Sequence, residues 1–484
     1  MHAFHYRDGK LYGEEVDLAR VAEQFGTPLY VYSAGTILDH YQRLDTALAT
    51  LDHLVCYAVK ANSNGAILKL LADAGAGFDI VSGGELFRVL RAGGDPTKCT
   101  FAGVGKSRDE IEYALDQHVY SFNVESEAEL DYIDKIAGAK KMRAPIALRA
   151  NPDVDPHTHE YISTGSHQNK FGIPLGRLPA VYQRAAQMRH LEIVGVQMHI
   201  GSQITEAKPF AEAIRKAAPL VRELKSKYAI QFFSIGGGMG IIYRRALESG
   251  SGKWWHDHDG EPSAFSVRDY AGAIVPPLRE LGIRVLVEPG RFLVGNAGVL
   301  ITRVRFIKSA AGQPARLCAG IRRGEQTAGK KFAIVDAGMN DLIRPALYQS
   351  YHEIVPVLDR GPLPGEGGTT IKEKRSASRP ESSKSKSESK SESERKRKGW
   401  EKIDIVGPVC ESGDFFALDR EMPDLHEGDL LAIMSAGAYG FVMASNYNSR
   451  PLPAEVLIRG DKVAFIRKRQ TWEDLVCDEI RVME

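Results

Sequence analysis

Eight short apolar runs, each followed by a stretch with helical periodicity, constrain the fold of this chain more than any other feature. They lie between about residues 54 and 289 and are rich in β-branched side chains, which is typical of α/β proteins built from βα units around a parallel sheet. Eight such units close a (β/α)8 TIM barrel, whereas an open doubly wound sheet usually has its glycine-rich turn after the first strand. Here the richest glycine cluster follows the seventh run, so we predict a barrel. The runs end at or near residues 60, 82, 103, 125, 149, 201, 238 and 290.

The sequence after residue 291 has a different texture. Short apolar runs separated by turns continue without regular helical patterns between them, which predicts a second, all-β domain of barrel or sandwich type. We therefore expect an N-terminal segment at 1–30, a barrel at 31–291 and a β domain at 292–484. The first part of the chain holds one predicted helix, at 17–25, followed by the strand LYVYS, which could pair with either domain.

Two polar stretches match neither domain. Residues 361–398 contain almost no apolar side chain and alternate serine with charges of both signs, so burial cannot offset the entropy lost on ordering them. We expect a disordered surface insertion there, and a milder polar insert at 310–331. The basic end of the longer insert, at 395–398, could form a localisation or nucleic-acid patch, but a solvated charged loop is the commoner meaning of such a run.

Charge and cysteine content exclude several classes of partner. With 63 basic and 62 acidic residues the net charge is +1, so no overall field favours nucleic acid or an anionic membrane, and a small ligand is expected. The first 26 residues are polar and mixed and lack the apolar core of a signal peptide, which predicts a cytoplasmic protein. Five cysteines without CxxC spacing or a nearby histidine cluster disfavour both a disulfide framework and a metal site.

Lys60 follows the first predicted barrel strand directly. Barrel enzymes place their reactive groups at the carboxyl ends of the strands, so this lysine is a candidate catalytic residue. A lysine becomes a carbonyl nucleophile when its neutral form is accessible, and a cofactor aldehyde gives a reason to hold it at such a position. Taken alone, a solvated charge at the end of the strand is the simpler interpretation.

Glycine residues follow the seventh predicted strand. The consecutive residues Gly236, Gly237 and Gly238 allow backbone N–H groups to approach a phosphate closely, and the loops after strands seven and eight are the usual phosphate site of this fold. A flexible turn is the alternative for any glycine cluster in isolation. The strand number favours the phosphate site.

The eighth predicted strand ends in Glu288-Pro289-Gly290-Arg291. A carboxylate that faces a pyridinium nitrogen keeps it protonated and so strengthens the ring as an electron sink, while the arginine can bind a carboxylate through two hydrogen bonds. An internal ion pair between Glu288 and Arg291 explains the tetrapeptide equally well.

On the sixth predicted strand, His199 is followed three residues later by Ser202. The imidazole could cover one face of an aromatic cofactor, and the hydroxyl could donate to a phosphate. A metal ligand is the alternative for the histidine, but no second histidine stands at i+4.

At this point the residues together resemble a known family, the barrel-type, fold type III decarboxylases that depend on pyridoxal 5'-phosphate (PLP). Several of the matching strings are six or more residues long and they lie in the order of the family, across nearly the whole chain. Within the family, the diaminopimelate decarboxylases are the most similar branch. The matching strings are YAVKAN, HIGSQ, GGG, EPGR, DLIRPALY, CESGD and GAYG.

The resemblance implies a role for each matching residue. Lys60 resembles the lysine that carries PLP as a Schiff base, His199 the imidazole that stacks on the ring, and Glu288 the carboxylate at the ring nitrogen. The implied phosphate cradle consists of Ser202, Gly236, Gly237, Gly238, Gly290 and Arg291, and Tyr439 also reaches the cofactor. The implied substrate-binding residues are Arg291, Arg344, Tyr348, Glu411 and Tyr439. The implied assembly is a homodimer in which Cys410, a catalytic proton carrier, and Glu411 come from the partner subunit.

The implied substrate is meso-diaminopimelate, which would lose carbon dioxide to give lysine. Both ends of diaminopimelate carry an amino acid group, so the distal end needs a carboxylate binder and an ammonium binder, for which Arg344 and Glu411 are the candidates. A family member that acts on ornithine, arginine or a carboxylated polyamine is the alternative, although an arginine aimed at a bare distal ammonium would repel it. For Arg344 alone, a surface salt bridge near Asp341 is the simpler interpretation.

Two further alternatives keep the fold but change the activity. A racemase normally needs a second base on the opposite face of the ring. A non-catalytic relative that binds a protein partner would be expected to have lost cofactor residues, whereas Lys60, His199, Glu288, Cys410 and Tyr439 are all present. Decarboxylation is therefore the better hypothesis.

Overall fold

The computed structural model describes residues 2–154, 170–259, 261, 264–310, 329–359 and 400–480. The second predicted insert, at 361–398, and most of the first, at 310–331, lie outside these residues.

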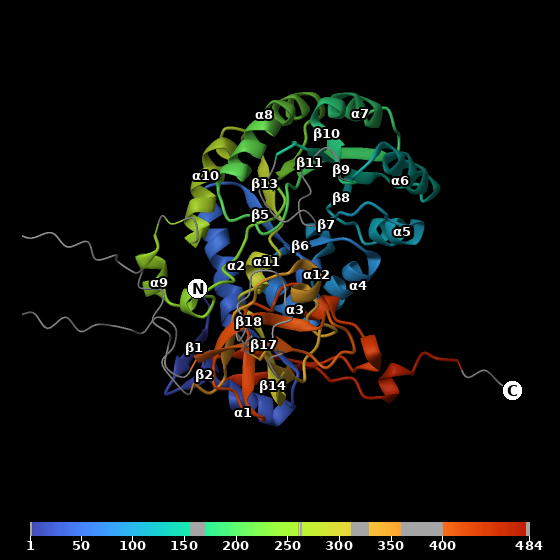
Figure 1. Ribbon diagram of the computed structural model, residues 1–484. Coiled ribbons are helices and arrows are strands. Elements are labelled where there is room, and N and C mark those ends of the chain that lie inside the picture. The colour runs from blue at the N-terminus through green and yellow to red at the C-terminus, as the bar shows by residue number, and fades with distance from the viewer. Residues whose placement is uncertain are drawn as a thin grey trace, which may run out of the picture.

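Eight parallel strands form a closed barrel, which confirms the predicted fold (Figure 1). Along the barrel the order is β9-β11-β12-β13-β5-β6-β7-β8, and β8 pairs with β9 to close it. Each of the eight apolar runs in the sequence contains one strand. They are β5 (His53–Ala58), β6 (Gly77–Ile80), β7 (Cys99–Phe101), β8 (Ser121–Val124), β9 (Ala144–Asn151), β11 (Leu191–Met198), β12 (Phe232–Ser234) and β13 (Arg284–Val287), with the short β10 (Ile173–Pro174) beside β9.

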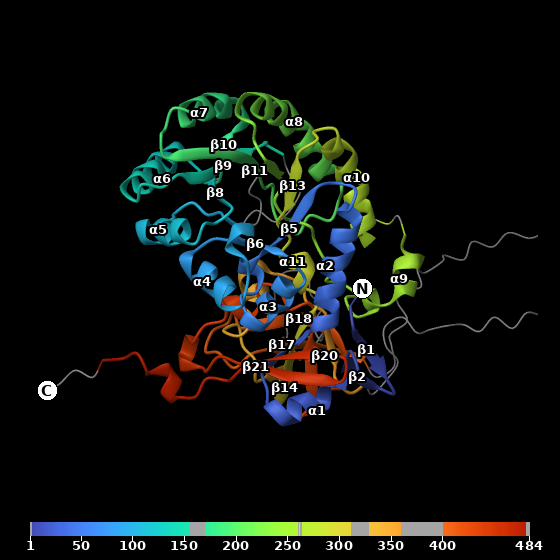
Figure 2. The ribbon, with the colours of Figure 1, turned by 180° about the vertical axis from the view of Figure 1, so that it is seen from behind.

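Helices cover the outside of the barrel (Figures 1 and 2). Serine begins three successive helices, because the hydroxyls of Ser82, Ser107 and Ser126 accept hydrogen bonds from backbone N–H groups in the first turn. The helices that cover the barrel are α2 (Ala34–Leu48), α3 (Gly65–Asp73), α4 (Gly83–Arg91), α5 (Arg108–Asp116), α6 (Glu127–Ala139), α7 (Leu178–Ala185), α8 (Lys208–Tyr228) and α10 (Val267–Arg279). Two short helices, α9 (Gly252–Asp257) and α11 (Arg291–Val294), lie apart from them, α9 to one side and α11 at the junction with the β domain.

A separate, mostly antiparallel sheet forms the second domain, as expected. Its main path runs β18-β17-β15-β14-β4-β20-β21, and β19 joins β14 to β16. A short helix, α12 (Arg344–Tyr348), also lies in this part of the chain, where the sequence indicated no helix. The strands are β14 (Gly298–Ser309), β15 (Lys331–Val335), β16 (Ile354–Pro356), β17 (Trp400–Val406), β18 (Phe415–Pro423), β19 (Leu430–Ile433), β20 (Ala454–Arg459) and β21 (Lys462–Arg467).

The N-terminal part of the chain packs with the β domain. Strand β4 (Leu29–Ser33), the LYVYS segment that the sequence left unplaced, pairs antiparallel with β14 and parallel with β20. Helix α1 (Leu18–Phe25) lies where the sequence predicts a helix, and its N-cap is Asp17. A small sheet of β1 (Phe4–Arg7), β2 (Lys10–Gly13) and β3 (Val16–Asp17) precedes it, which the sequence did not predict.

A set of hydrogen bonds, the interdomain cluster, joins the β domain to the loop that follows β5. The buried Glu455 of β20 accepts hydrogen bonds from Tyr32 at 2.7 Å and from Asn64 at 2.9 Å. Asn62 donates to the carbonyl of Gly437 at 3.1 Å. Since Lys60 lies in the same loop, the β domain helps to hold the segment that carries this lysine.

Among the described helices, none combines the length and the apolar character that crossing a membrane requires. The cytoplasmic location expected from the sequence stays a prediction.

Candidate active site

A cavity of about 220 Å³ lies at the carboxyl ends of the barrel strands, where the barrel meets the β domain. The sequence-predicted residues of both domains line it together. From the barrel come Lys60, His199, Ser202, Gly237, Gly238, Glu288, Gly290 and Arg291, and from the β domain come Arg344, Tyr348 and Tyr439.

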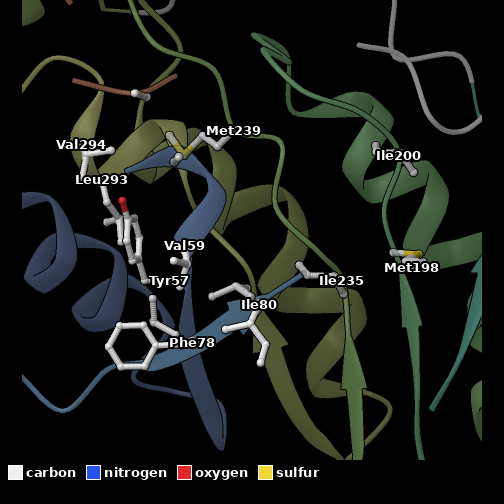
Figure 3. Close-up of a cluster of buried hydrophobic side chains, with 14 of the residues drawn as sticks. Tyr57, Val59, Phe78, Ile80, Met198, Ile200, Ile235, Met239, Leu293 and Val294 are labelled. Carbon is white, nitrogen blue, oxygen red and sulfur yellow. The ribbon is translucent and has the colours of Figure 1, made fainter. Parts of the chain in front are cut away.

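Apolar side chains support the loops around this cavity. Figure 3 shows Tyr57 and Val59, which precede Lys60 in the chain, together with other buried side chains from the neighbouring strands and from α11. Tyr57 is fully buried, and its hydroxyl donates to the carbonyl of Asn62 at 2.9 Å. The close packing fixes the backbone that leads to the lysine.

Lys60 lies two residues beyond the end of β5, in a short 3₁₀ turn. Its Nζ donates to Oδ2 of Asp79 at 2.7 Å, and Asp79, in β6, is fully buried. Burial alone would lower the pKa of Lys60, but the charge of Asp79 and its hydrogen bond outweigh this effect and raise the pKa above its ordinary value. Asp79 therefore holds Lys60 as an ammonium ion and is the nearest base that could take a proton from it.

The three consecutive glycines leave no room for side chains. A Cβ atom on Gly237 would lie 2.1 Å from the carbonyl oxygen of Glu288, and one on Gly236 would lie 2.5 Å from that of Met198. Gly236 and Gly238 also adopt positive φ angles of 70° and 109°, which favour glycine. The loop after β12 is thus a backbone surface that a ligand can approach closely.

His199 lies directly beside this glycine loop. Its Nδ1 accepts a hydrogen bond from the backbone N–H of Gly237 at 3.2 Å, so the imidazole is oriented by the loop. Burial, followed by the charges of Arg149 and Lys60, lowers the pKa of His199 well below its ordinary value. The ring is therefore neutral at neutral pH.

Glu288 forms no ion pair with Arg291, so the internal pair considered from the sequence is wrong. Instead its two carboxylate oxygens accept hydrogen bonds from Ser234 at 2.6 Å and Gln197 at 3.1 Å. Burial raises the pKa of Glu288 to about 7, helped by the charge of Asp79 and opposed by these hydrogen bonds and by Lys60.

Two buried arginines face the cavity with tyrosines between and around them. Arg291 donates to Ser202 at 3.1 Å and to the hydroxyl of Tyr243 at 2.5 Å. Its guanidinium carbon lies 4.8 Å from the ring centroid of Tyr439. Burial alone would raise the pKa of Tyr243, but the charges of Arg291 and Arg344 outweigh it and lower the pKa.

Arg344 begins α12 and is only 6 % exposed, so the surface salt bridge considered from the sequence is wrong. It donates to Ser350 at 3.3 Å and lies over the rings of Tyr243 and Tyr348. Within the described residues, neither Arg344 nor Arg291 forms an ion pair with a carboxylate. Two buried positive charges without a protein counter-charge are suited to an anionic ligand.

Cys410 and Glu411 are exposed and do not line this cavity. Their loop is held by the buried carboxylate of Asp414, which accepts from the backbone N–H groups of Val409 and Met339, each at 2.6 Å. Glu411 accepts from the hydroxyl of Tyr447 at 2.9 Å. The structure therefore does not bring these two sequence-predicted residues together with Lys60 in one chain.

Several cavity residues were not predicted from the sequence. Asp79, Gln197 and Arg149 line the cavity, and Arg149 pairs with the buried Glu125 at 2.8 Å. Ser234 reaches it only through Glu288. The available signal was a polar residue inside or at the end of an otherwise apolar strand, where burial demands a partner.

The cavity fits PLP by three observations. Backbone at the glycine loop occupies the space that side chains would fill, Glu288 is a buried carboxylate suited to a pyridinium, and Lys60 provides an amine for the aldehyde. In addition, Oδ1 of Asp79, Oε1 of Gln197 and Nε of Arg291 are buried without a hydrogen-bond partner in the protein. Such atoms indicate room for a polar ligand.

Comparison with known families agrees with this description. The family described as "Pyridoxal-dependent decarboxylase, pyridoxal binding domain" matches residues 34–295, which is the barrel from α2 to α11.

Full-length relatives and solved structures match as well. The diaminopimelate decarboxylase of Pseudomonas aeruginosa is 45% identical over 480 residues, which cover 99% of each chain. That of Aquifex aeolicus is 42% identical, covering 97% of this chain and 96% of the relative. The crystal structure of diaminopimelate decarboxylase from Helicobacter pylori complexed with L-lysine matches with a TM-score of 0.77 at 36% identity, covering 95% of this chain and 98% of that one. The M. jannaschii enzyme in co-complex with L-lysine gives 0.80 at 33% identity, covering 100% and 99%.

Proposed function

Because this chain belongs to the pyridoxal-dependent decarboxylase family and, within it, to the diaminopimelate decarboxylases, we propose that it converts meso-2,6-diaminopimelate to L-lysine and carbon dioxide with the cofactor PLP. This reaction is the last step of lysine biosynthesis. The observation that carries the proposal beyond family membership is the buried Arg344, which lies in the same cavity as Lys60 and has no carboxylate partner among the described residues.

In this proposal the barrel holds the cofactor. Ser202 and the backbone of Gly236, Gly237, Gly238, Gly290 and Arg291 would bind its phosphate, Glu288 would face the ring nitrogen, and the neutral His199 would lie against one face of the ring. Lys60 would be the amine that carries the cofactor. When bound, PLP supplies a protonated ring that accepts the electron pair left behind when carbon dioxide departs.

Lys60 and Asp79 handle the first proton. As an ammonium ion Lys60 cannot attack a carbonyl, so its proton must leave before it can react. The carboxylate of Asp79, at 2.7 Å, is placed to accept that proton and to return it.

The arginines bind the two ends of the substrate. Two guanidinium groups suit the two carboxylates of diaminopimelate, and we assign Arg344, with Tyr348, Tyr439 and Glu411, to the distal end. The pair of Arg344 and Glu411 is what would separate diaminopimelate from ornithine or arginine, because only diaminopimelate carries both a carboxylate and an ammonium group at its distal end.

We further propose a homodimer with a composite active site. Cys410 and Glu411 are exposed in their own chain, and the buried Asp414 holds their loop in a defined shape, as a surface that meets a second subunit would require. The thiol of Cys410 from the partner subunit then returns a proton to the α-carbon after carbon dioxide has left.

Spectroscopy and substrate comparison test the chemistry. Wild-type protein reconstituted with PLP should show the visible absorbance of the lysine-linked cofactor, and Lys60→Ala should lose it. Retention of the same band in Lys60→Ala would contradict the assignment. Turnover of meso-diaminopimelate should exceed that of ornithine and arginine. Faster turnover of ornithine would contradict the role of Arg344.

Mixing two inactive variants tests the composite site. Lys60→Ala and Cys410→Ala proteins, unfolded and refolded together, should regain about a quarter of the wild-type activity, because half of the dimers would be mixed and each would hold one intact site. If the mixture stays inactive while each variant forms dimers, Cys410 acts within its own chain. If Cys410→Ala alone is active, Cys410 has no role.

A further inference from the structure

We propose that Ser234 and Gln197 are positioning residues that hold Glu288 as a carboxylate for the ring nitrogen of the cofactor. The inference rests on the proposed function, because it takes the cofactor ring to lie against Glu288. Neither residue belongs to a motif by which the family was identified, and both were found only through their contacts.

Ser234 has one hydrogen to donate, and its surroundings direct that hydrogen to Glu288. Its Oγ accepts the backbone N–H of Gly236 at 3.3 Å and lies 2.6 Å from Oε1 of Glu288. A hydroxyl that accepts from an N–H on one side and faces a carboxylate on the other donates to the carboxylate. The same serine therefore connects the glycine loop to the carboxylate at the ring nitrogen.

Gln197 donates to the second oxygen of Glu288. Its Nε2 lies 3.1 Å from Oε2, while its own Oε1 is buried without a partner. The reversed amide would place two oxygens against each other, so the donating orientation is the only favourable one beside a carboxylate. The protein keeps this orientation although it leaves one acceptor of the amide unsatisfied.

The sheet itself sets the position of both donors. Gln197 of β11 and Ser234 of β12 are direct neighbours in register, and Ser234 is paired in turn with Leu286 of β13, two residues before Glu288. Gln197, Ser234 and Glu288 are 1 %, 0 % and 5 % exposed. Bulk water therefore cannot replace either donor.

These two donors oppose other influences on the same carboxyl group. Burial and the nearby charge of Asp79 favour the neutral acid form of Glu288, whereas Lys60 and the two hydrogen bonds favour its carboxylate form. The thiol of Cys56 adds no positive charge, and burial raises its pKa. A carboxylate accepts a hydrogen bond from a protonated ring nitrogen, whereas a neutral carboxyl group keeps the proton itself. Loss of either donor should therefore move the proton from the ring toward Glu288.

Nitrogen NMR of the holoenzyme, loaded with PLP labelled with ¹⁵N in the ring, tests this inference directly. Ser234→Ala and Gln197→Met should each move the ring ¹⁵N resonance toward that of neutral pyridine, and each should lower kcat about tenfold, because a hydrogen bond to a charged group is lost. Ser234→Thr, which keeps the hydroxyl, should restore the wild-type resonance. Ser121→Ala is the matched control, since it removes a buried hydroxyl of β8 whose partner is the neutral side chain of Asn123.

Glu288→Gln separates failure of this inference from failure of the proposed site. If Glu288→Gln moves the resonance but Ser234→Ala and Gln197→Met leave it at the wild-type position, the positioning role is wrong and the cofactor placement stands. If Glu288→Gln leaves it unchanged, the ring nitrogen does not face Glu288 and both ideas fail. Should Ser234→Ala fold poorly, Ser234→Cys replaces it, because a thiol keeps the volume but is a weak donor.

Discussion

The barrel and the β domain contribute to the same cavity in different ways. The barrel delivers one to three residues from the end of each contributing strand, such as Lys60 after β5, Asp79 in β6 and Glu288 after β13. The β domain contributes Arg344 and Tyr348 from one short helix, and Tyr439 from a turn after β19. The barrel thus fixes its residues through the register of a closed sheet, whereas the β domain presents side chains from its connections.

This difference suggests a division of labour. Under the proposed function, the barrel residues mainly hold the cofactor, although Arg291 also binds one substrate carboxylate, and the β-domain residues Arg344 and Tyr348 select and bind the distal end of the substrate. Substitutions in the barrel should therefore change cofactor binding, and those in the β domain should change substrate binding or stability while cofactor affinity is preserved. Four experiments test this division.

The largest effect is expected for Gly237→Ala in the barrel. The new Cβ would lie 2.1 Å from a backbone oxygen of Glu288, so the loop must move, and PLP affinity should fall about a hundredfold. Equilibrium dialysis with PLP measures the change. Gly272→Ala in α10 is the control, because nothing lies within 4 Å of its Cβ position. Unchanged PLP affinity in Gly237→Ala would show that this loop does not bind the phosphate of PLP.

Arg344→Ala in the β domain should raise KM for diaminopimelate about thirtyfold, because a buried charge that binds a carboxylate is lost. Steady-state kinetics at saturating PLP measure this, and the dissociation constant of PLP should stay at the wild-type value. If Arg344→Ala also lost PLP affinity, the proposed division of roles between the two domains would be wrong.

Asn64→Ala should act on the junction between the domains. It removes the hydrogen bond to the buried carboxylate of Glu455 and the N-cap hydrogen bond from Ala66 at the start of α3, so the free energy of unfolding should fall by about 1–2 kcal/mol. Urea denaturation followed by fluorescence gives the value. Asn64→Asp should destabilise more than Asn64→Ala, because it places a second negative charge beside Glu455. The reverse order would show that the N-cap of α3, where the Asn64 side chain accepts from the backbone N–H of Ala66, outweighs repulsion by Glu455.

The smallest effect is expected for the pH dependence of stability that arises from Asp341 in the β domain. Burial raises the pKa of Asp341 from 3.8 to about 7, despite a backbone hydrogen bond from Gly338. The folded state therefore holds this proton more tightly than the unfolded state, and stability is lost as the pH rises toward 7 and through it. Between pH 6 and pH 8 wild type should lose about 1 kcal/mol relative to Asp341→Asn. If thermal unfolding shows that the stabilities of the two proteins change equally between pH 6 and pH 8, the assignment is contradicted.

The sequence predicted the barrel well because parallel βα units repeat a simple pattern. Each buried strand is an apolar run, and its end marks the position of a candidate residue, as for Lys60 and His199. The same logic could not find Gln197 or Ser234, because their importance depends on which strands become neighbours in the closed sheet. Periodicity within one strand carries no information about that pairing.

The β domain was harder to predict in detail. The strand LYVYS could be recognised, but its partners β14 and β20 are distant in sequence, and pairing between distant strands leaves no local mark. Helix α12 is only five residues long, too short for a helical period to emerge. The roles of Cys410 and Glu411 came from resemblance alone, and their exposure in a single chain leaves those roles as predictions.

The position of β4 has a consequence for the order in which the chain can fold as it is made. On the ribosome, β4 at residues 29–33 emerges before the barrel, yet its partners begin at residues 298 and 454. The barrel is complete by about residue 290, so it can close before the partners of β4 have been synthesised. N-terminal units generally fold first during synthesis. The β domain is therefore assembled last, from the segments that precede and follow the barrel in the sequence. The interdomain cluster that holds the loop of Lys60 forms only at that final step.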